Sequence, residues 1–280
     1  MYKTSPPLFC SRELTVKVPG RTLVQELNLD LKAGELLAIL GQNGAGKSLT
    51  LHTLAGLREA ATGHIELNGE PITSLTRRTV ARKLALLPQN SEDIFPATVF
   101  DTVLIGRHPH IEPLHWESAQ DRQMAHDCLQ EMDLADLSNR DLATLSGGER
   151  RRLAIAQTLA QDPSIFLLDE PTNHLDPQHQ LDVLKLFVER KKQGATVVAC
   201  LHDVNLAARF ADRCLLLYGD GRWHLGDTGD VLTEETLSEL YQVKMESLAW
   251  RGMSLFIATG SSIADQESSV HGLRSAEAAG

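Results

Sequence analysis

The sequence predicts an α/β protein with a mainly parallel sheet, because short apolar segments alternate with longer segments of helical character. Three of the apolar segments have the length and composition of buried strands, at residues 35–40, 164–168 and 195–201. Helices are expected over 47–57 and 177–192, and the second has proline at its first position and Gly194 just after its end.

The segment between Gln89 and Gln161 differs from the rest of the chain. Its apolar residues follow a helical spacing and it contains no strand signal, so we expect a helical insertion in the sheet-based core. The last residues are small and polar. We therefore expect one large domain over 1–263, with a helical subdomain at about 90–162, and a disordered tail over 264–280.

Composition excludes several functions. The chain has 280 residues and a net charge of −10, from 27 basic and 37 acidic residues, which argues against nucleic acid as a partner. The four cysteines form no CxxC pair and no zinc spacing, as expected for a reduced, cytosolic protein. We find no signal peptide and no segment of about 20 apolar residues. A role in transport would therefore need a second chain that spans the membrane.

A glycine-rich loop between a predicted strand and a predicted helix matches the pattern GxxxxGK[ST]. Its backbone N–H groups can surround phosphate oxygens, and the following helix directs its positive end toward them. Lys47 would neutralise the β- and γ-phosphates, and Ser48 would bind Mg²⁺. The alternative is a turn that binds nothing. The predicted nucleotide-binding residues here are Gly41, Gln42, Asn43, Gly44, Ala45, Gly46, Lys47, Ser48 and Leu49.

Two adjacent carboxylates, Asp169 and Glu170, end the second apolar strand. Buried carboxylates are costly unless a metal ion or hydrogen-bond donors accompany them. Asp169 could hold the Mg²⁺ shell, directly or through water. Glu170 could act as general base on an attacking water. A solvated strand end before Pro171 is the structural alternative.

A second anion-binding helix start is predicted about a hundred residues after the first. Ser146 is a good N-cap for a helix over 150–161, and two glycines leave backbone N–H groups open. A well-capped helix without a ligand would have the same sequence. The residues concerned are Ser146, Gly147, Gly148 and Glu149.

Taken together, these motifs resemble the ATP-binding subunits of ABC transporters over roughly residues 14–243. The resemblance implies a P-loop NTPase core, with a RecA-like sheet, antiparallel N-terminal strands and an inserted helical subdomain. It also implies ATP and Mg²⁺ as cofactors, and a head-to-tail homodimer. ATP would lie between the phosphate loop of one subunit and the Leu145–Gly148 signature of the other.

Three further segments resemble the same family. Gln89 matches the Q-loop glutamine, which senses Mg²⁺ and the membrane subunit. His202, after the third strand, matches the switch histidine that contacts the γ-phosphate. Residues 173–176 match the D-loop at the dimer contact. Glu170, His202, Lys47 and Gln89 are thus the predicted catalytic residues, and Ser48, Gln89 and Asp169 the predicted metal ligands.

The sequence departs from the family pattern at three positions. Val18 stands where an aromatic residue usually stacks on adenine, so base selectivity would be weaker. Leu49 follows Ser48 where threonine is common, and Glu149 replaces the commoner glutamine of the signature. None of these changes removes a catalytic group, and we expect active ATP hydrolysis.

The segment 98–110 resembles the importer subunits for iron-siderophores, haem and cobalamin. This branch implies an iron chelate as cargo, a separate integral membrane permease, an indirect role for a periplasmic or surface substrate-binding protein, and a peripheral location on the cytoplasmic face of the cell membrane. An apolar groove for a permease helix is expected, lined by Ile94, Phe95, Val99, Val103 and Leu104.

Several alternatives remain open from sequence. The cargo could be cobalamin or another compound, or the chain could be a soluble ABC-type ATPase of iron–sulfur assembly. A nucleotide-binding regulator without turnover is a third class, which Glu170 and His202 disfavour. Direct iron binding by His108, His110 and His115 is disfavoured because Pro109 and Pro113 break any helix that would align the rings.

Overall fold

The computed structural model describes residues 8–89 and 96–262. Ile94 and Phe95 of the expected groove lie outside these residues, and so does the expected tail over 264–280.

A six-stranded sheet forms the centre of the fold, with strand order β10-β9-β3-β8-β7-β6. All of its neighbours are parallel except β10, which pairs antiparallel with β9. The bounds are β3 Leu36–Leu40, β6 Leu84–Leu87, β7 Ile165–Asp169, β8 Thr196–Cys200, β9 Arg213–Leu217 and β10 Trp223–Asp227. Because the strands are parallel, the carboxyl ends of β3, β6, β7 and β8 meet at one edge of the sheet.

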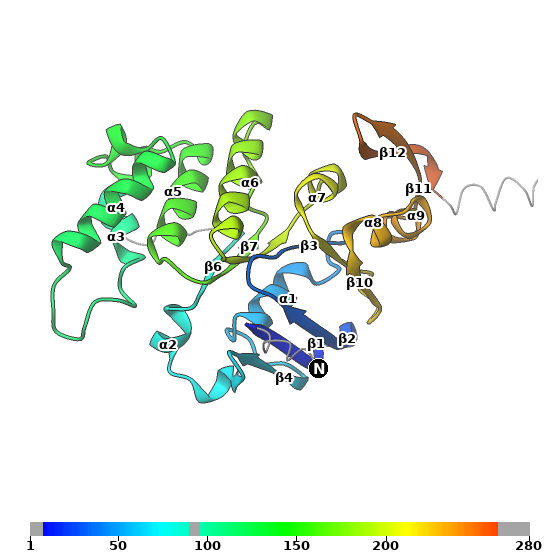
Figure 1. The fold of residues 1–280 in the computed structure, drawn as a ribbon, viewed down its shortest axis with the longest axis horizontal. Coiled ribbons are helices and arrows are strands. Elements are labelled where there is room, and N and C mark those ends of the chain that lie inside the picture. The colour runs from blue at the N-terminus through cyan, green and yellow to red at the C-terminus, as the bar shows by residue number, and fades with distance from the viewer. Residues whose placement is uncertain (1–7, 90–95, 263–280) are drawn as a thin grey trace, which may run out of the picture.

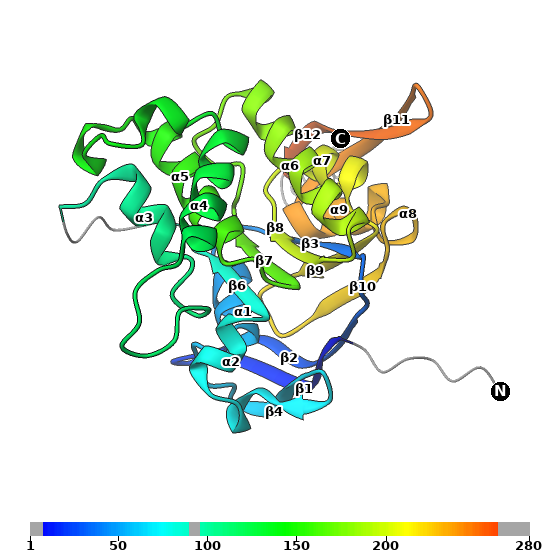
Figure 2. The ribbon, with the colours of Figure 1, turned by 60° about the vertical axis from the view of Figure 1, so that its left-hand side comes forward.

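Both faces of this sheet are covered, which explains why its strands are continuously apolar. Leu36, Ala38 and Leu40 of β3 belong to the core under the helices, and Leu37 and Ile39 belong to a second core on the opposite face. Figures 1 and 2 show α3, α4, α5 and α6 (the α-helices between residues 99 and 192) on one side of the sheet, and α1 (Lys47–Leu54) between the sheet and the N-terminal strands. The fold is thus layered around the central sheet.

The N-terminal strands form a second, antiparallel sheet with the order β2-β1-β4-β5. Their bounds are β1 Phe9–Val18, β2 Arg21–Leu31, β4 Thr62–Leu67 and β5 Glu70–Pro71. A short 3-10 turn, η1 Ile72–Ser74, and α2 Arg77–Ala81 lead from this sheet to β6. The mixed α/β architecture with antiparallel N-terminal strands is as the resemblance implied.

Between 96 and 161 the described residues form helices and no strand longer than an isolated bridge. The helices are α3 Val99–Ile105, α4 Ala119–Glu131 and α5 Gly147–Ala160, with 3-10 turns η2 Ala135–Leu137 and η3 Leu142–Thr144. In Figure 1 the three α-helices lie together at one end of the molecule, in green. Val99 and Val103 are fully buried in their core. These two residues therefore do not line an open groove, since their face of α3 packs against α4 and α5.

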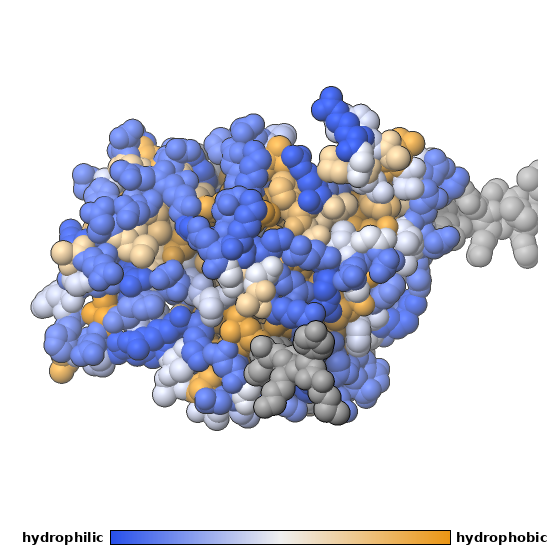
Figure 3. All heavy atoms as spheres, viewed as in Figure 1, coloured by the Kyte–Doolittle hydropathy of each residue, from blue (hydrophilic) through white to orange (hydrophobic). Residues whose placement is uncertain are grey.

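The C-terminal part consists of α6 Pro177–Lys192, α7 Val204–Phe210, α8 Thr228–Val231, α9 Glu234–Tyr241 and a hairpin of β11 Val243–Trp250 with β12 Met253–Ser262. The face of the molecule in Figure 3 is mostly hydrophilic over α4, α5 and α6. Exposed apolar residues of the hairpin are Leu248, Trp250, Met253 and Ile257. No helix within 8–89 and 96–262 is both long and apolar enough to cross a membrane.

Two helix boundaries differ from the sequence expectation. The helix expected over 47–57 ends at Leu54, because Gly56 adopts a left-handed φ of 67° that reverses the chain. The helix expected from Arg150 begins at Gly147, directly after the N-cap Ser146. Both glycines of the signature are thus inside the first turn.

Candidate functional site

The phosphate loop connects β3 to α1, and at two of its glycines, Gly41 and Gly46, a side chain would meet neighbouring atoms. A Cβ on Gly41 would lie 2.6 Å from the carbonyl oxygen of Leu217. Gly46, the N-cap of α1, has a φ of 100° and makes no side-chain cap, so the N–H groups of the first turn remain open. This geometry is that of an anion-binding helix start.

Lys47 points back into this loop. Its side chain is buried, and Nζ donates to the carbonyl oxygens of Gly41 at 2.8 Å and Gln42 at 3.3 Å. Burial lowers the pKa of Lys47, while Glu170 and Asp169 act in the opposite direction. A phosphate beside Lys47 would add a further negative charge and favour the charged ammonium.

Glu170, one residue past the end of β7, is the centre of the site. Its Oε2 accepts hydrogen bonds from Nε2 of Gln89 at 2.9 Å and from Nδ2 of Asn173 at 3.1 Å. Its Oε1 lies 2.5 Å from Nε2 of His202. The side chain of Glu170 is 8% exposed and that of His202 is 48% exposed. The carboxylate is therefore held by three polar side chains from three separate loops, and the imidazole reaches solvent.

Asp169 is placed beside the phosphate loop at the end of β7. It is 1% exposed, and neither carboxylate oxygen has a hydrogen-bond partner. Burial raises the pKa of Asp169; the nearby Ser48 hydroxyl lowers it, without meeting the geometry of a hydrogen bond. A buried carboxylate without donors, next to a hydroxyl, fits the oxygen ligands that Mg²⁺ prefers.

A hollow of about 520 Å³ lies between the phosphate loop and Glu170, and Asp169 is not among its lining residues. Six of its lining residues belong to the phosphate loop, and Gln89, Glu170, Asn173 and His202 complete the wall. The lining residues are Asn43, Gly44, Gly46, Lys47, Ser48, Leu49, Gln89, Glu170, Asn173 and His202. Val18, expected near the base, is not among them and packs partly against the second core.

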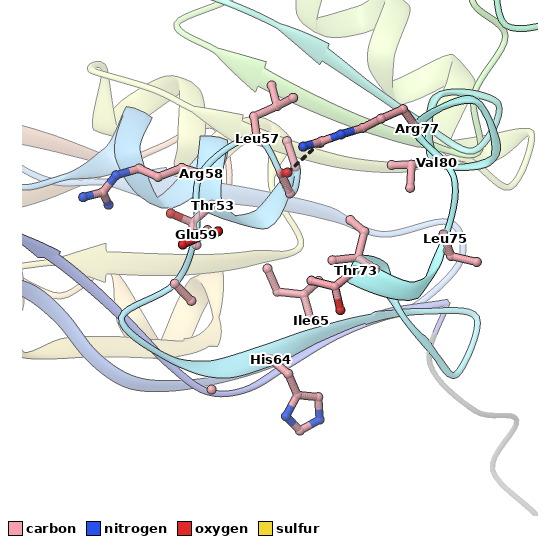
Figure 4. Close-up of a pocket in the computed structure, with 15 residues that line it drawn as sticks. Thr53, Leu57, Arg58, Glu59, His64, Ile65, Thr73, Leu75, Arg77 and Val80 are labelled. Carbon is pink, nitrogen blue, oxygen red and sulfur yellow. Dashed lines mark hydrogen bonds between the residues drawn. The ribbon is translucent and has the colours of Figure 1, made fainter.

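A larger hollow of about 630 Å³ lies elsewhere, at the carboxyl end of α1 (Figure 4). It is lined by residues of α1, β4, η1 and α2, and Arg77 closes one side through a hydrogen bond to the carbonyl oxygen of Gly56 at 2.7 Å. None of the predicted site residues lines it. The larger volume of this hollow therefore does not identify it as the catalytic site.

The signature residues do not join the phosphate loop within one chain. Ser146 caps α5 by accepting from the backbone N–H of Glu149, and the Glu149 carboxylate accepts from the N–H and hydroxyl of Ser146, both at 2.7 Å. Ser146 and Gly147 are exposed. This segment lines no part of the 520 Å³ hollow. The two helix starts predicted to bind anions are thus separate in the single chain, and only the first borders the hollow.

The sequence reasoning missed two residues of the site. Asn173 was expected only at a dimer contact, yet its amide bonds Glu170. Arg151 was given no role from the sequence, yet it is 6% exposed and its guanidinium reaches the loops after β6 and β7. Arg151 stands four residues before Ile155 and eight before Leu159, which are both apolar. This helical spacing predicts that Arg151 shares their buried face of α5, and it is the signal in the sequence that could have identified this residue.

Two of the three histidines considered for iron binding contact backbone carbonyl oxygens. His110 Nε2 lies 2.8 Å from the carbonyl oxygen of Gln161, and His115 Nδ1 lies 3.2 Å from that of Pro113. Within the described residues, no group of three or more His, Cys, Asp or Glu side chains is arranged to hold a metal ion.

Comparison with known proteins agrees with this geometry. The profile of the ABC transporter family matches residues 24–173. The hemin import ATP-binding protein HmuV of Deinococcus radiodurans is 43% identical over 76% of this chain and 82% of its own length. The iron(3+)-hydroxamate import ATP-binding protein FhuC of Bacillus subtilis is 34% identical over 84% of this chain and 88% of its own.

Solved structures give the same result for the fold. A structure described as an inward-facing transporter of the metal-chelate ABC type superposes with a TM-score of 0.78 at 31% identity, covering 90% of this chain and 97% of its own. The dimeric post-hydrolysis structure of the ATP-binding cassette MJ0796, bound to ADP and Pi, gives 0.68 at 26% identity, covering 79% and 98%. The chain therefore belongs to the ABC transporter family, as an ATP-hydrolysing cassette.

Proposed function

We propose that this chain drives the import of an iron chelate, a siderophore or haem, through a separate membrane permease. The relatives named for hemin and iron(3+)-hydroxamate import support this cargo class, and they favour import over a role in iron–sulfur assembly. The chain would lie on the cytoplasmic face of the cell membrane, bound to the permease. A periplasmic or surface substrate-binding protein would deliver the chelate to that permease.

The observation that carries the proposal is the convergence of Gln89, Asn173 and His202 on the Glu170 carboxylate, beside an open phosphate loop. Glu170 is the only carboxylate that lines this hollow among the described residues, so it is the group positioned to accept a proton from water. Lys47 and the loop N–H groups would bind the β- and γ-phosphates.

A second copy of the chain would complete the site. The Ser146 helix start lies outside the hollow and is exposed, so a γ-phosphate bound by another subunit could approach it. Dimeric structures of a related ATP-binding cassette support this arrangement. Closure on ATP and opening after hydrolysis would then move the bound permease.

Mg²⁺ would be held by Ser48 and Asp169, with Gln89 nearby, and would neutralise phosphate charge during transfer. His202, whose Nε2 lies 2.5 Å from Oε1 of Glu170, would contact the γ-phosphate from the loop after β8. The alternative of direct attack without a base is disfavoured, because three side chains orient the Glu170 carboxylate.

The first test is Glu170→Gln in the purified protein. Loss of the base should lower kcat by about 10²–10⁴-fold, leave ATP affinity intact and trap an ATP-bound dimer. Glu35→Gln serves as control, since Glu35 is also buried and paired, with Arg213, but lies outside the hollow. Turnover of the Glu170→Gln protein at the control rate would refute the assignment.

The second test addresses the partner. The tagged protein would be purified from detergent-solubilised membranes, and the proteins that remain bound would be identified by mass spectrometry. A polytopic permease supports the import proposal and narrows the cargo. A soluble partner without any membrane protein would contradict it while leaving the ATPase assignment intact.

A further inference from the structure

Arg151 connects the helical subdomain to both loops of the catalytic edge. Nη1 donates to the carbonyl oxygens of Pro88 at 2.6 Å and Gln89 at 3.3 Å. Nη2 donates to those of Asp169 at 2.5 Å and Glu170 at 2.7 Å. Nε lies 3.4 Å from the carbonyl oxygen of Pro171. One guanidinium therefore contacts two residues after β6 and three at the end of β7.

The partners of Arg151 are unusual for a buried cation. It is 6% exposed, and among the described residues its hydrogen bonds go to backbone carbonyls and it forms no ion pair with a carboxylate. Burial lowers the pKa of Arg151 to about 10, with Asp169 and Glu170 opposing the shift, so the group is charged near neutral pH. Burying a charge is costly unless donors and acceptors are matched, and here the planar fork matches the carbonyls of two loops.

These carbonyls belong to the residues whose side chains meet at the site. Gln89 Nε2 and Glu170 Oε2 are 2.9 Å apart, although the two residues are 81 positions apart in sequence. Glu170 has a φ of 50°, a left-handed conformation that a side-chain-bearing residue adopts only when its surroundings hold it. The bond from Arg151 to the Glu170 carbonyl oxygen is one such restraint.

We infer that Arg151 is a positioning residue for ATP hydrolysis, which holds the Gln89 and Glu170 backbones at the spacing that lets their side chains meet. Arg151 does not line the hollow, and its hydrogen bonds go to the loops after β6 and β7 and not to the phosphate loop. Its effect on the reaction is therefore exerted through Gln89 and Glu170. The inference rests on the roles proposed above for those two residues.

Arg107 provides a matched control. It is 9% exposed, belongs to the same helical region, and bonds Asp121 at 2.9 Å and the carbonyl oxygen of Ala160 at 2.8 Å. These contacts do not reach the loops after β6 or β7. Arg→Lys at either position keeps the charge and removes the fork. A comparison of Arg151→Lys with Arg107→Lys thus separates loss of a buried guanidinium from loss of this connection.

The experiment measures thermal stability, ATP affinity and steady-state kinetics for both variants. Arg151→Lys should lower kcat by about ten- to a hundredfold, the effect of a misplaced catalytic group, while ATP affinity and KM stay within about twofold. Arg107→Lys should keep kcat near the parent value. Arg151→Gln is measured in parallel, since its amide keeps two donors if the lysine variant fails to fold. Equal kcat losses at the two arginines, or a parallel loss of ATP affinity in the Arg151 variants, would overturn the inference.

A double-mutant cycle with Gln89→Ala tests the route of the effect. If Arg151 acts partly by placing Gln89, the kcat loss from Arg151→Lys should be smaller in the Gln89→Ala background. The same full loss in both backgrounds would overturn that route. Glu170→Gln separates the test of the base from the test of the positioning residue. Normal turnover of Glu170→Gln would reject Glu170 as the base. If Glu170→Gln is inactive but Arg151→Lys and Arg107→Lys lose kcat equally, only the positioning role of Arg151 is rejected.

Discussion

The two helix starts predicted to bind phosphate are built differently. α1 begins at Gly46, which supplies no side-chain cap, and Lys47 bonds loop carbonyls. α5 begins at Ser146, which is closed by a reciprocal capping box with Glu149. The first start is therefore open to an anion within one chain, whereas the second is occupied by its own carboxylate. We propose from this difference that one chain binds ATP at α1 and that α5 acts only when a partner brings a phosphate to it.

The largest effect should come from Lys47→Ala. Charge-assisted hydrogen bonds contribute about 1.5–3 kcal/mol each, so the loss of two such bonds to phosphate would weaken ATP binding by roughly 10²–10⁴-fold. The measurement is equilibrium binding of a fluorescent ATP analogue to the isolated subunit. Unchanged affinity would show that the open loop around α1 is not the primary phosphate site.

The next contrast is Gly147→Ala against Gly46→Ala. A Cβ on Gly147 meets nothing within 4 Å and its φ is not positive, so the subunit should fold and bind ATP normally. Turnover should fall by about a hundredfold, because the added methyl group would keep the N–H groups of this helix start away from the negative charge that develops on the phosphate.

Gly46→Ala should behave in the opposite way. A Cβ there lies 3.0 Å from Cβ of Leu23, and the φ of 100° is unfavourable for alanine, at a cost of roughly 1–2 kcal/mol. ATP affinity of the isolated subunit should fall about tenfold. An equal loss of ATP affinity in the isolated subunit for both glycine variants would contradict the proposal that α1 binds ATP within one chain and α5 contacts the ATP of a partner.

The parts of the site that could be predicted from sequence are those that follow from the parallel sheet. The carboxyl ends of β3, β6, β7 and β8 carry Gly41, Gln89, Asp169 and His202, so the convergence of these residues at one edge is implied by strand direction. The sequence pattern does not show which side chains form hydrogen bonds with one another at this edge of the sheet. The three donors to Glu170 depend on loop conformations, including its left-handed φ.

Other features depended on packing partners that a single segment does not reveal. Val99 and Val103 follow a helical spacing, which shows that they share a face but not whether that face meets a permease or α5. Arg151 stands between two other arginines, and its helical spacing places it on the buried face of α5 but does not show which loops it contacts. The early end of α1 depended on the left-handed conformation of Gly56.

The smallest predicted effect concerns Glu149, which occupies the start of α5. The Ser146 hydroxyl donates to its carboxylate at 2.7 Å, and this bond and the Ser146 N–H lower the pKa of Glu149, so it is ionised near neutral pH. An approaching γ-phosphate must displace this bond and meets a like charge. Glu149→Gln keeps the capping box, because glutamine fills the same position, but removes the charge and weakens the acceptor.

We therefore expect Glu149→Gln to tighten the ATP-dependent dimer a few-fold. The measurement is the monomer–dimer equilibrium by analytical ultracentrifugation, in the Glu170→Gln background so that ATP is not consumed. The gain should shrink at high salt, which screens exposed charges. It should also vanish as pH falls through the lowered pKa of Glu149, because the parent then becomes neutral at this position too. A dimer of equal or weaker affinity at low salt would mean that the capping box is not in competition with the partner's phosphate.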